Sequence, residues 1–330
     1  MKTVLPDRPD KGEYVHHYLD ILCGQRKLSG NTLDSYRRDL SQLMEMAGET
    51  GLAQLSPADI RRFVSHLHAS GLSPRSIARK LSVWRVFFQW LVEEAILPSN
   101  PADDIHAPKK SKPLPKALSV DDAIRLVSAG PSAENAPLAH QESLWCDHAM
   151  FELLYSSGLR VSELTGLDVH AVRLSDYTSA GWIDLKEKEV TVTGKGNKTR
   201  IVPVGGAAIA ALEKWLEVRN SLVRPDALPQ HAFALFVNSR GKRISPRLVQ
   251  LRLHAHAERL GLPVNVHPHV LRHSFASHIL QSSGDLRAVQ EMLGHSSIAS
   301  TQIYTALDFQ HLAKVYDSAH PRAKIKKSGN

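Results

Sequence analysis

Cysteine is scarce in this sequence. The 330 residues include two cysteines, Cys23 and Cys146, which lie far apart and do not have the spacing of a metal site. This usage fits a reducing, cytosolic setting better than a disulfide-stabilised secreted domain. Isolated cysteines of this kind usually behave as small apolar side chains, so we expect both thiols to be buried.

Long apolar segments and internal repeats are also absent from the sequence. The first ten residues lack the apolar stretch of a signal peptide, and no run reaches the length of a transmembrane helix. The hydrophobic share of 42% nevertheless allows a proper core, and 330 residues predict about two domains. We therefore expect a two-domain cytoplasmic protein.

Acidic residues are in deficit. Lys and Arg total 41 against 33 for Asp and Glu, which gives a net charge of +8 and a pI of about 9.4. On charge alone, a nucleic-acid partner and an ordinary basic protein are equally compatible. Residues 60–92, however, contain no Asp or Glu. We interpret this stretch as a phosphate-binding face, with Arg61, Arg62, Arg75, Arg79 and Lys80 as its candidate DNA contacts.

Capping signals divide the first part of the chain into helices. Ser56-Pro57 and Ser73-Pro74 each place a capping side chain before a proline in the first helical turn. Together with apolar periodicity, they predict a helical domain over residues 12–97, preceded by a disordered segment, residues 1–11. The aromatic residues of its last helix are expected to form core rather than to stack on bases.

Residues 98–118 are rich in proline and lysine, which predicts an extended linker. Its part that holds the prolines and lysines, residues 98–116, spans at most roughly 60 Å. We expect three of its lysines, Lys109, Lys110 and Lys112, to touch phosphates, although a plain interdomain tether has the same composition.

The second domain is predicted over residues 119–305 as mainly α with a small antiparallel β-sheet. Short β-rich runs occur at 181–186, 189–193 and 199–204, with a further strand at 233–238. Arg160 lies in a turn between two buried helices, where an arginine binds either backbone carbonyls or an anion. We expect Ser162 to cap the second of these helices. The hairpin turn before residue 199 holds Lys195, with Lys198 as the competing candidate for a lysine in a cleft.

The stretch from 267 to 304 carries most of the chemistry. A helix beginning at Pro268 places His269 and Arg272 on one face, a glycine-bounded helix follows, and His295 comes directly after it. Tyr304 lies nine positions further on. Arginines match phosphate oxygens, whereas a tyrosine, with a reference pKa of about 10, needs activating neighbours before it can attack.

The H-x-x-R, L-G-H-S and following Tyr of this stretch resemble the catalytic end of the tyrosine recombinases, and the tail T-Q-I-Y-T-A-L-D-F resembles their Xer branch. The resemblance runs from about Tyr14 to Lys324. It implies a two-domain clamp on DNA, with a helical core-binding (SAM-like) domain and a catalytic domain. It also implies that residues 306–330 form a C-terminal helix and basic tail that contact a neighbouring protomer. The alternative is that this last helix, which we expect to begin at Asp308 and to run to Ala319, caps its own domain.

The resemblance also implies a role for each candidate catalytic residue. Arg160 and Arg272 would bind the non-bridging oxygens of the scissile phosphate, with a further hydrogen bond from His295. His269 would act as general base or acid, Lys195 would protonate the leaving 5′-hydroxyl, and Tyr304 would be the nucleophile. Tyr316 is the nearest rival to Tyr304. We expect no cofactor and no metal, because the histidine-rich helix lacks the glutamate of H-E-x-x-H.

The implied partners are double-stranded DNA with a dif-like recombination site, a second, XerD-like recombinase in a heterotetramer, and an FtsK-like septal DNA translocase. The implied function is resolution of chromosome dimers by a nucleoid-associated enzyme in the cytoplasm. Two alternatives stay open at this point. One is a type IB topoisomerase-like nicking and closing enzyme, and the other is a catalytically idle DNA-binding protein.

Overall fold

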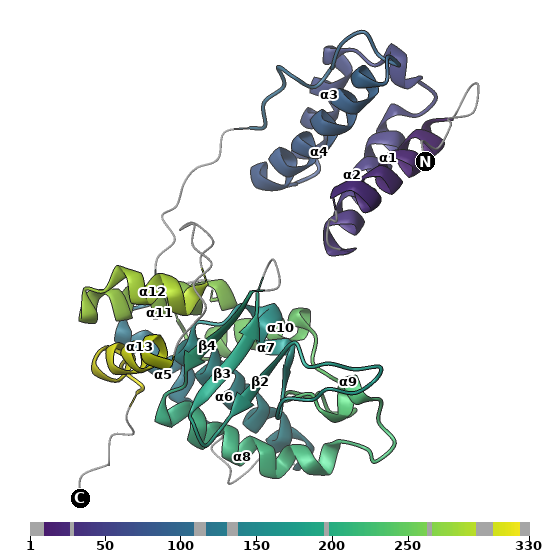
Figure 1. Ribbon diagram of the computed structural model, residues 1–330. Helices are drawn as coiled ribbons and strands as arrows, with labels where there is room; N and C mark the ends of the chain where they lie inside the picture. The colour runs from purple at the N-terminus through teal and green to yellow at the C-terminus, as the bar shows by residue number, and fades with distance from the viewer. Residues whose placement is uncertain are drawn as a thin grey trace, which may run out of the picture. The chain divides into compact units, whose positions relative to one another are not determined.

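The chain forms two compact units, Met1–Pro113 and Leu114–Asn330, seen in the computed structural model of Figure 1. Each unit is described by itself. The structure describes the following residues: 10–26, 30–108, 117–130, 138–194, 198–262, 266–294 and 306–323.

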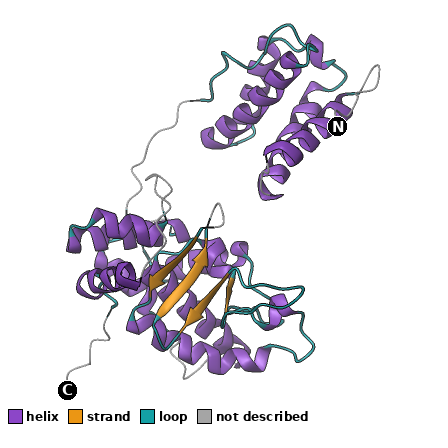
Figure 2. Cartoon of the chain, viewed as in Figure 1, coloured by secondary structure: helices purple, strands orange, loops and turns teal. Residues whose placement is uncertain are grey.

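The N-terminal unit is helical, as the capping signals predict (Figure 2). At α3 the Ser56 hydroxyl accepts from the Asp59 backbone N–H at 3.3 Å, and Asp59 accepts from the Ser56 N–H at 3.0 Å. Ser73 caps α4 by accepting from the Ser76 N–H at 3.2 Å. The elements are α1 (Lys11–Arg26), α2 (Gly30–Ala47), the short 3₁₀ helix η1 (Leu52–Gln54), α3 (Pro57–Ala69) and α4 (Pro74–Glu93).

Aromatic side chains fill the core of this unit. Tyr18 of α1 packs against two of them, with ring centroids 5.3 Å from Phe87 and 5.2 Å from Trp90. Trp84 is fully buried and donates from its indole N–H to the Asp39 carbonyl at 2.9 Å. The expectation that the α4 aromatics form core is thus confirmed, and these rings are not available to bases.

The segment after α4 is held to the N-terminal unit. Ala102 and Ile105 are buried in its core. The Arg85 guanidinium donates to the Ala102 carbonyl at 3.2 Å and to the Ile105 carbonyl at 2.8 Å. Asn100 donates in turn to the Arg85 carbonyl at 3.1 Å. The first part of the predicted linker therefore packs as part of this unit, and Arg85 faces backbone carbonyls.

The C-terminal unit surrounds a long central helix, α6 (Leu138–Ser157), which contacts α5, α8, α10 and α11 (Figure 1). Gly158 ends α6 in the left-handed region, at a φ of 56°. The other helices are α5 (Val120–Ser128), α7 (Val161–Thr165), α8 (Gly206–Leu222), α9 (Pro229–Ala232), α10 (Pro246–Arg259), α11 (Pro268–Ser283), α12 (Leu286–Leu293) and α13 (Ala306–Ala319).

The sheet of this unit is mixed, not purely antiparallel as predicted. Its strand order is β1-β2-β3-β4, and β1 pairs with β2 in parallel while the other two pairings are antiparallel. The parallel pairing arises because the chain after β1 runs out through a loop and returns to start β2 at the same end. The strands are β1 (Leu167–Asp168), β2 (Gly181–Asp184), β3 (Glu189–Thr193) and β4 (Thr199–Pro203).

The strand predicted at 233–238 is wrong. This segment makes isolated bridges to Asp168 and Arg243 instead of a ladder. Side chains of α8 occupy its carbonyls, since Trp215 donates to the Leu235 carbonyl at 2.8 Å and Arg219 to the Ala234 carbonyl at 2.7 Å. A carbonyl already bonded to a side chain is less available to a neighbouring strand.

Three smaller expectations also need correction. Helix α7 begins at Val161 with Arg160 as its N-cap, whereas the sequence suggested Ser162 as the cap. Helix α13 begins at Ala306, so Asp308 lies within its first turn. Cys146 is buried as expected, but Cys23 is exposed on α1. Among the described helices, none combines the length and hydrophobicity needed to cross a membrane.

Candidate active site

The turn between α6 and α7 sets the position of Arg160. Gly158 has a positive φ, and a Cβ at this position would overlap the ring of Phe275 on α11. Only glycine fits both requirements, the backbone conformation and the close approach. The turn therefore brings the start of α7, with Arg160 as its N-cap, against α11.

Glu163 on α7 is the centre of the arginine cluster. Its carboxylate accepts from the Arg160 backbone N–H at 2.8 Å and from the Arg160 guanidinium at 2.7 Å. Arg200 of β4 donates to both carboxylate oxygens, at 2.9 Å each. Burial by itself would raise the pKa of Glu163, but the hydrogen bonds and charges of Arg200 and Arg160 lower that pKa to about 2. Glu163 is thus a carboxylate at any physiological pH.

Arg272 on α11 approaches the same carboxylate, with its Nη1 3.9 Å from a Glu163 oxygen. The guanidinium also donates to the Gly158 carbonyl and to the Leu293 carbonyl, at 2.5 Å each. Burial and then the charge of Arg160 lower the pKa of Arg272 to about 10, which leaves it a cation at neutral pH. The structure therefore brings Arg160 and Arg272 together around one carboxylate.

The predicted polar face of α11 is divided in the structure. His269 and His273 are exposed, while Arg272 is buried with 6% of its surface accessible. His269 lies one helical turn before Arg272, and residues at this spacing are neighbours on a helix surface. Its ring stacks on that of His267, with centroids 6.3 Å apart. His269 thus lies at the solvent-exposed side of the arginine cluster.

Lys195, His295 and Tyr304 lie outside the described residues, but two of their chain neighbours lie inside them. Gly194 precedes Lys195, and a Cβ placed on it would be 3.6 Å from Arg200 Nη1. Gly294 precedes His295, and a Cβ there would be 3.2 Å from the same nitrogen. Two segments that are far apart in the sequence therefore approach one guanidinium. The rival lysine, Lys198, is exposed at the start of β4.

Tyr316, the rival nucleophile, lies in the core. It is 1% exposed, and its hydroxyl is 2.6 Å from Ser156 Oγ. Burial raises the pKa of Tyr316 well above its ordinary value. A phenol that is enclosed and hard to ionise is a poor nucleophile for a phosphate.

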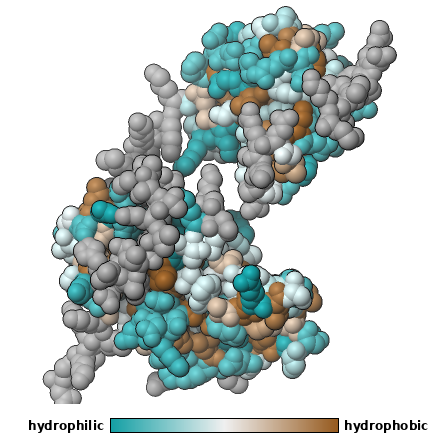
Figure 3. Space-filling model, in the orientation of Figure 1, coloured by the Kyte–Doolittle hydropathy of each residue, from teal (hydrophilic) through white to brown (hydrophobic). Residues whose placement is uncertain are grey.

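The candidate DNA contacts of the N-terminal unit differ in exposure. Arg61, Arg62 and Arg75 are exposed, and the visible face of this unit carries many hydrophilic residues (Figure 3). Lys80 is buried, and its ammonium donates to the fully buried Asp39 carboxylate at 2.8 Å. Arg79 pairs with the same carboxylate while its side chain stays 49% exposed. Lys80 is therefore an internal partner of Asp39, and Lys109, Lys110 and Lys112 lie outside the described residues.

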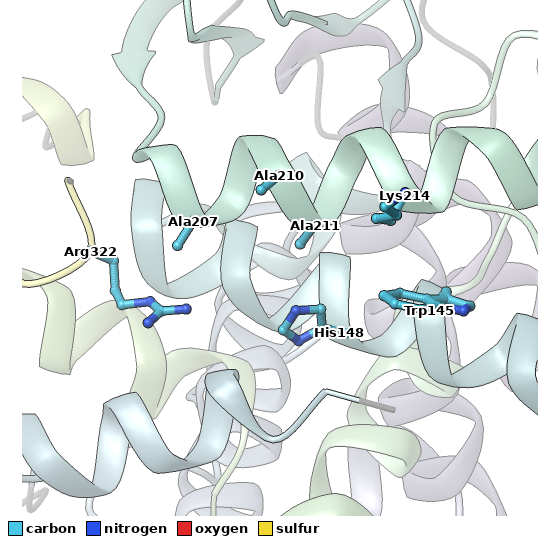
Figure 4. Close-up of a pocket in the computed structure, with 7 residues that line it drawn as sticks. All are labelled: Trp145, His148, Ala207, Ala210, Ala211, Lys214 and Arg322. Atoms are coloured by element: carbon cyan, nitrogen blue, oxygen red, sulfur yellow. The ribbon is translucent and has the colours of Figure 1, made fainter. Parts of the chain in front are cut away.

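A separate hollow lies between α6 and α8 (Figure 4). Trp145 and His148 of α6 face three alanines of α8 across it, with Arg322 at one end. Its described lining contains none of the candidate catalytic residues. Over the described ranges of the chain, His, Cys, Asp and Glu side chains form no group of three that could hold a metal ion.

Glu163 and Arg200 were missed by sequence reasoning. A signal for Glu163 existed, since a glutamate at the third position of a helix is placed to accept from the N-cap N–H. A signal for Arg200 is weaker. It stands at an inward position of β4, where the alternation calls for an apolar side chain.

Comparison with known proteins identifies the fold. The phage integrase family profile matches residues 133–311, and the profile of the phage integrase N-terminal SAM-like domain matches residues 15–95. The chain belongs to the phage integrase family. Tyrosine recombinase XerC 1 of Ralstonia nicotianae is 54% identical to it, over 97% of this chain and 96% of that protein. Tyrosine recombinase XerC of Pseudomonas aeruginosa is 47% identical, over 94% and 95%.

Solved structures of integrases share the fold. A Tn1549 transposon integrase in complex with circular intermediate DNA has a TM-score of 0.64 at 17% identity, covering 90% of this chain and 98% of that one. A lambda integrase dimer bound to a COC′ core site has a TM-score of 0.62 at 19% identity, covering 89% and 99%. The predicted two-domain, mainly helical architecture of a tyrosine recombinase is confirmed. The chain is a tyrosine recombinase similar to XerC, and thus a site-specific DNA recombinase.

Proposed function

We propose that this tyrosine recombinase cuts and rejoins DNA strands through a 3′-phosphotyrosyl intermediate on Tyr304. Arg160, Arg272 and His295 bind the scissile phosphate. His269 acts as general base or acid near the tyrosine, and Lys195 protonates the leaving 5′-hydroxyl. A 5′-hydroxyl of the partner strand then attacks the phosphotyrosine and reverses the step, so no external energy source is needed.

The observation that carries this proposal is the gathering of Arg160 and Arg272 around Glu163, with Gly194 and Gly294 against Arg200. Two guanidiniums held close together suit a phosphodiester, because negative charge builds up on its non-bridging oxygens in the transition state. Glu163 neutralises part of their mutual repulsion. The Arg160 side chain keeps 40% of its surface exposed and is open to a ligand.

We propose that the N-terminal unit binds the DNA backbone through its exposed cations. Arg61, Arg62 and Arg75 are the strongest candidates, and Arg79 contributes the part of its guanidinium that Asp39 leaves free. Lys109, Lys110 and Lys112 are proposed to add further phosphate contacts. Contacts of this kind give affinity without reading sequence and weaken as salt rises.

We further propose that the substrate is a dif-like site and that the enzyme works on it with an XerD-like second recombinase, under an FtsK-like translocase. The support is the 54% identity to a protein named tyrosine recombinase XerC over nearly the whole chain. The resulting function is resolution of chromosome dimers on the nucleoid, in the cytoplasm.

A nicked suicide substrate tests the chemistry. The wild-type chain, incubated with a labelled duplex nicked beside the scissile phosphate of a dif-like site, should form a covalent adduct that maps to Tyr304. Tyr304→Phe should form none, because it lacks the attacking hydroxyl, while still shifting the duplex in a gel.

Three outcomes contradict parts of this proposal. An adduct that persists in Tyr304→Phe refutes the choice of nucleophile. Binding without any adduct in the wild type points to an idle DNA-binding protein. Relaxed circles as the sole product on paired sites point to a topoisomerase.

A further inference from the structure

Arg200 is buried at a point where three distant segments meet. It is the second residue of β4, with 4% of its side chain exposed. Its Nη1 and Nη2 donate to the two oxygens of Glu163 on α7, and its Nε donates to the Met292 carbonyl in the last turn of α12 at 2.8 Å. One side chain thus joins β4, α7 and α12.

The arrangement requires a guanidinium. Arg200 donates two parallel N–H groups to the Glu163 carboxylate and a third N–H to the Met292 carbonyl. Arginine offers these donors in a fixed planar fork. A lysine ammonium carries the same charge, but it is a single point and cannot hold both acceptors in this geometry.

The backbone on both sides of Arg200 is closely packed. A Cβ on Gly294 would lie 3.1 Å from Arg200 Cδ and 3.2 Å from Nε, and Gly294 has a φ of 63°. Both the conformation and the contact favour glycine. On the hairpin side, a Cβ on Gly194 would lie 3.6 Å from Nη1. Arg200 therefore packs against the residues that directly precede His295 and Lys195.

We infer that Arg200 is a positioning residue, which fixes Gly194 and Gly294, the residues directly before Lys195 and His295, relative to the Glu163-bound Arg160. This inference rests on the proposed function of those residues. Arg200 itself is enclosed by protein and does not reach the phosphate. Its effect is to hold groups from separate elements in one arrangement, and small errors in such an arrangement slow a reaction strongly.

The pH dependence of the cleavage rate distinguishes a positioning role of Arg200 from a contribution to the stability of the fold alone. Glu163 owes its lowered pKa first to the hydrogen bonds and charge of Arg200, which oppose its burial. In Arg200→Met the burial remains and those bonds are lost, so the pKa of Glu163 must rise. Protonated Glu163 holds Arg160 less well. The acid limb of the rate profile should therefore move to higher pH in this variant.

The experiment measures single-turnover adduct formation on the nicked dif-like duplex, with full-length enzyme in excess, as a function of pH. Arg200→Met should be slower by roughly 100-fold and Arg200→Lys by roughly tenfold, as expected for misplaced catalytic groups. Both should retain wild-type affinity for the duplex. The acid limb should shift upward in Arg200→Met.

Arg243→Met is the matched control. Arg243 also pairs with a fully buried carboxylate, that of Asp168, and donates to the carbonyls of Thr165 and Leu167 at 3.0 and 2.9 Å. Its loss should lower the stability to denaturant as much as Arg200→Met does, with no change in cleavage rate of the folded enzyme or in its acid limb. If Arg200→Met does not fold, Arg200→Lys carries the same comparison.

The outcomes distinguish this inference from the function on which it rests. A wild-type enzyme that forms no adduct refutes the proposed function. If the wild type forms the adduct and the Arg200 variants form it at the wild-type rate, the positioning role is refuted. The third outcome is that the Arg200 and Arg243 variants lose the same factor in cleavage rate and the acid limb does not shift. Arg200 then has only a structural role.

Discussion

Arg160 and Arg272 share a carboxylate but differ in their surroundings. The Arg160 side chain is 40% exposed and bonds to Glu163, whereas the Arg272 side chain is 7% exposed and also holds two backbone carbonyls. Both guanidiniums can stabilise a transition state. Arg272 also binds the carbonyls of two buried residues, Gly158 and Leu293, so its removal affects the fold as well.

Substitution by alanine should separate these two contributions. Arg160→Ala and Arg272→Ala should each slow adduct formation by roughly 100-fold, which corresponds to the loss of about 3 kcal/mol of transition-state stabilisation. Arg272→Ala should in addition lower the free energy of unfolding by about 1–3 kcal/mol, because it leaves buried carbonyls unpaired. Single-turnover kinetics and denaturant unfolding measure the two effects.

DNA binding is the control for this pair, and both variants should bind the duplex nearly as well as the wild type. A catalytic role would be contradicted if Arg272→Ala bound the duplex poorly and the complexes that did form cleaved at the wild-type rate. Equal losses of stability in both variants would contradict the structural difference.

At the scale of elements, α13 packs on its own unit in the single chain. Leu312 and Tyr316 lie in the core of that unit, and α13 contacts α11, α12 and β4. Beyond the helix, Arg322 pairs with the buried Glu152. That α13 docks into a neighbouring protomer therefore stays a prediction. Deleting the chain after residue 307 is a poor test of it, because the deletion would also open the core.

The end of α13 is held by a buried imidazole. His320 stacks on Tyr316 with ring centroids 4.8 Å apart, and its Nε2 is 3.2 Å from the Tyr155 carbonyl. Burial lowers the pKa of His320 to about 3. His278, which contacts the Tyr155 hydroxyl at 2.9 Å, has its pKa lowered by burial as well. The folded unit keeps the His320 ring neutral in mild acid.

Mild acid should accordingly destabilise the C-terminal unit. Below pH 6.5 the His320 side chain takes up a proton in the unfolded chain but not in the folded chain. The folded unit therefore has its full stability above pH 6.5 and loses stability as the pH falls toward the folded pKa of His320. One such group costs about 1.4 kcal/mol per pH unit. The destabilisation caused by His320→Phe should therefore shrink by about 2 kcal/mol between pH 6.5 and 5. Denaturant unfolding at both pH values checks this, and a constant difference would contradict it.

At the scale of the whole molecule, the excess of positive charge is divided between exposed and internal cations. Arg75 and Lys80 lie on the same helix, α4, yet Arg75 is exposed and Lys80 is bonded to Asp39. Their charges count equally in the net charge of +8. Only an exposed cation can release counterions from DNA.

The salt dependence of DNA binding should reflect this division. Arg75→Gln should reduce the slope of log K against log salt by about 0.9, the contribution of one phosphate contact. Lys80→Met should leave the slope unchanged and lower the stability of the N-terminal unit, because the buried Asp39 carboxylate loses one of its two cationic partners, Lys80, and keeps Arg79. Titrations over a range of salt concentrations measure both slopes. A change of slope in Lys80→Met would show that its ammonium reaches DNA.

The sequence predicts features that depend on neighbouring residues better than features that depend on residues far apart in the chain. Ser56-Pro57 and Ser73-Pro74 mark helix starts by local chemistry, and both predictions are confirmed. The Glu163–Arg200 pair joins residues 37 positions apart, and Arg272 reaches a carbonyl 114 positions away. No local pattern encodes such pairings. The motif indicated that Arg160 and Arg272 act together, but not the carboxylate that holds them.

Arg85 makes the residues that follow α4 part of the N-terminal unit. Its bonds to the Ala102 and Ile105 carbonyls hold the chain to this unit up to that point. Arg85→Ala would remove these bonds, so the stretch from Ala102 to Ile105 should open more often. A protease would then cut the variant there sooner than it cuts the wild type.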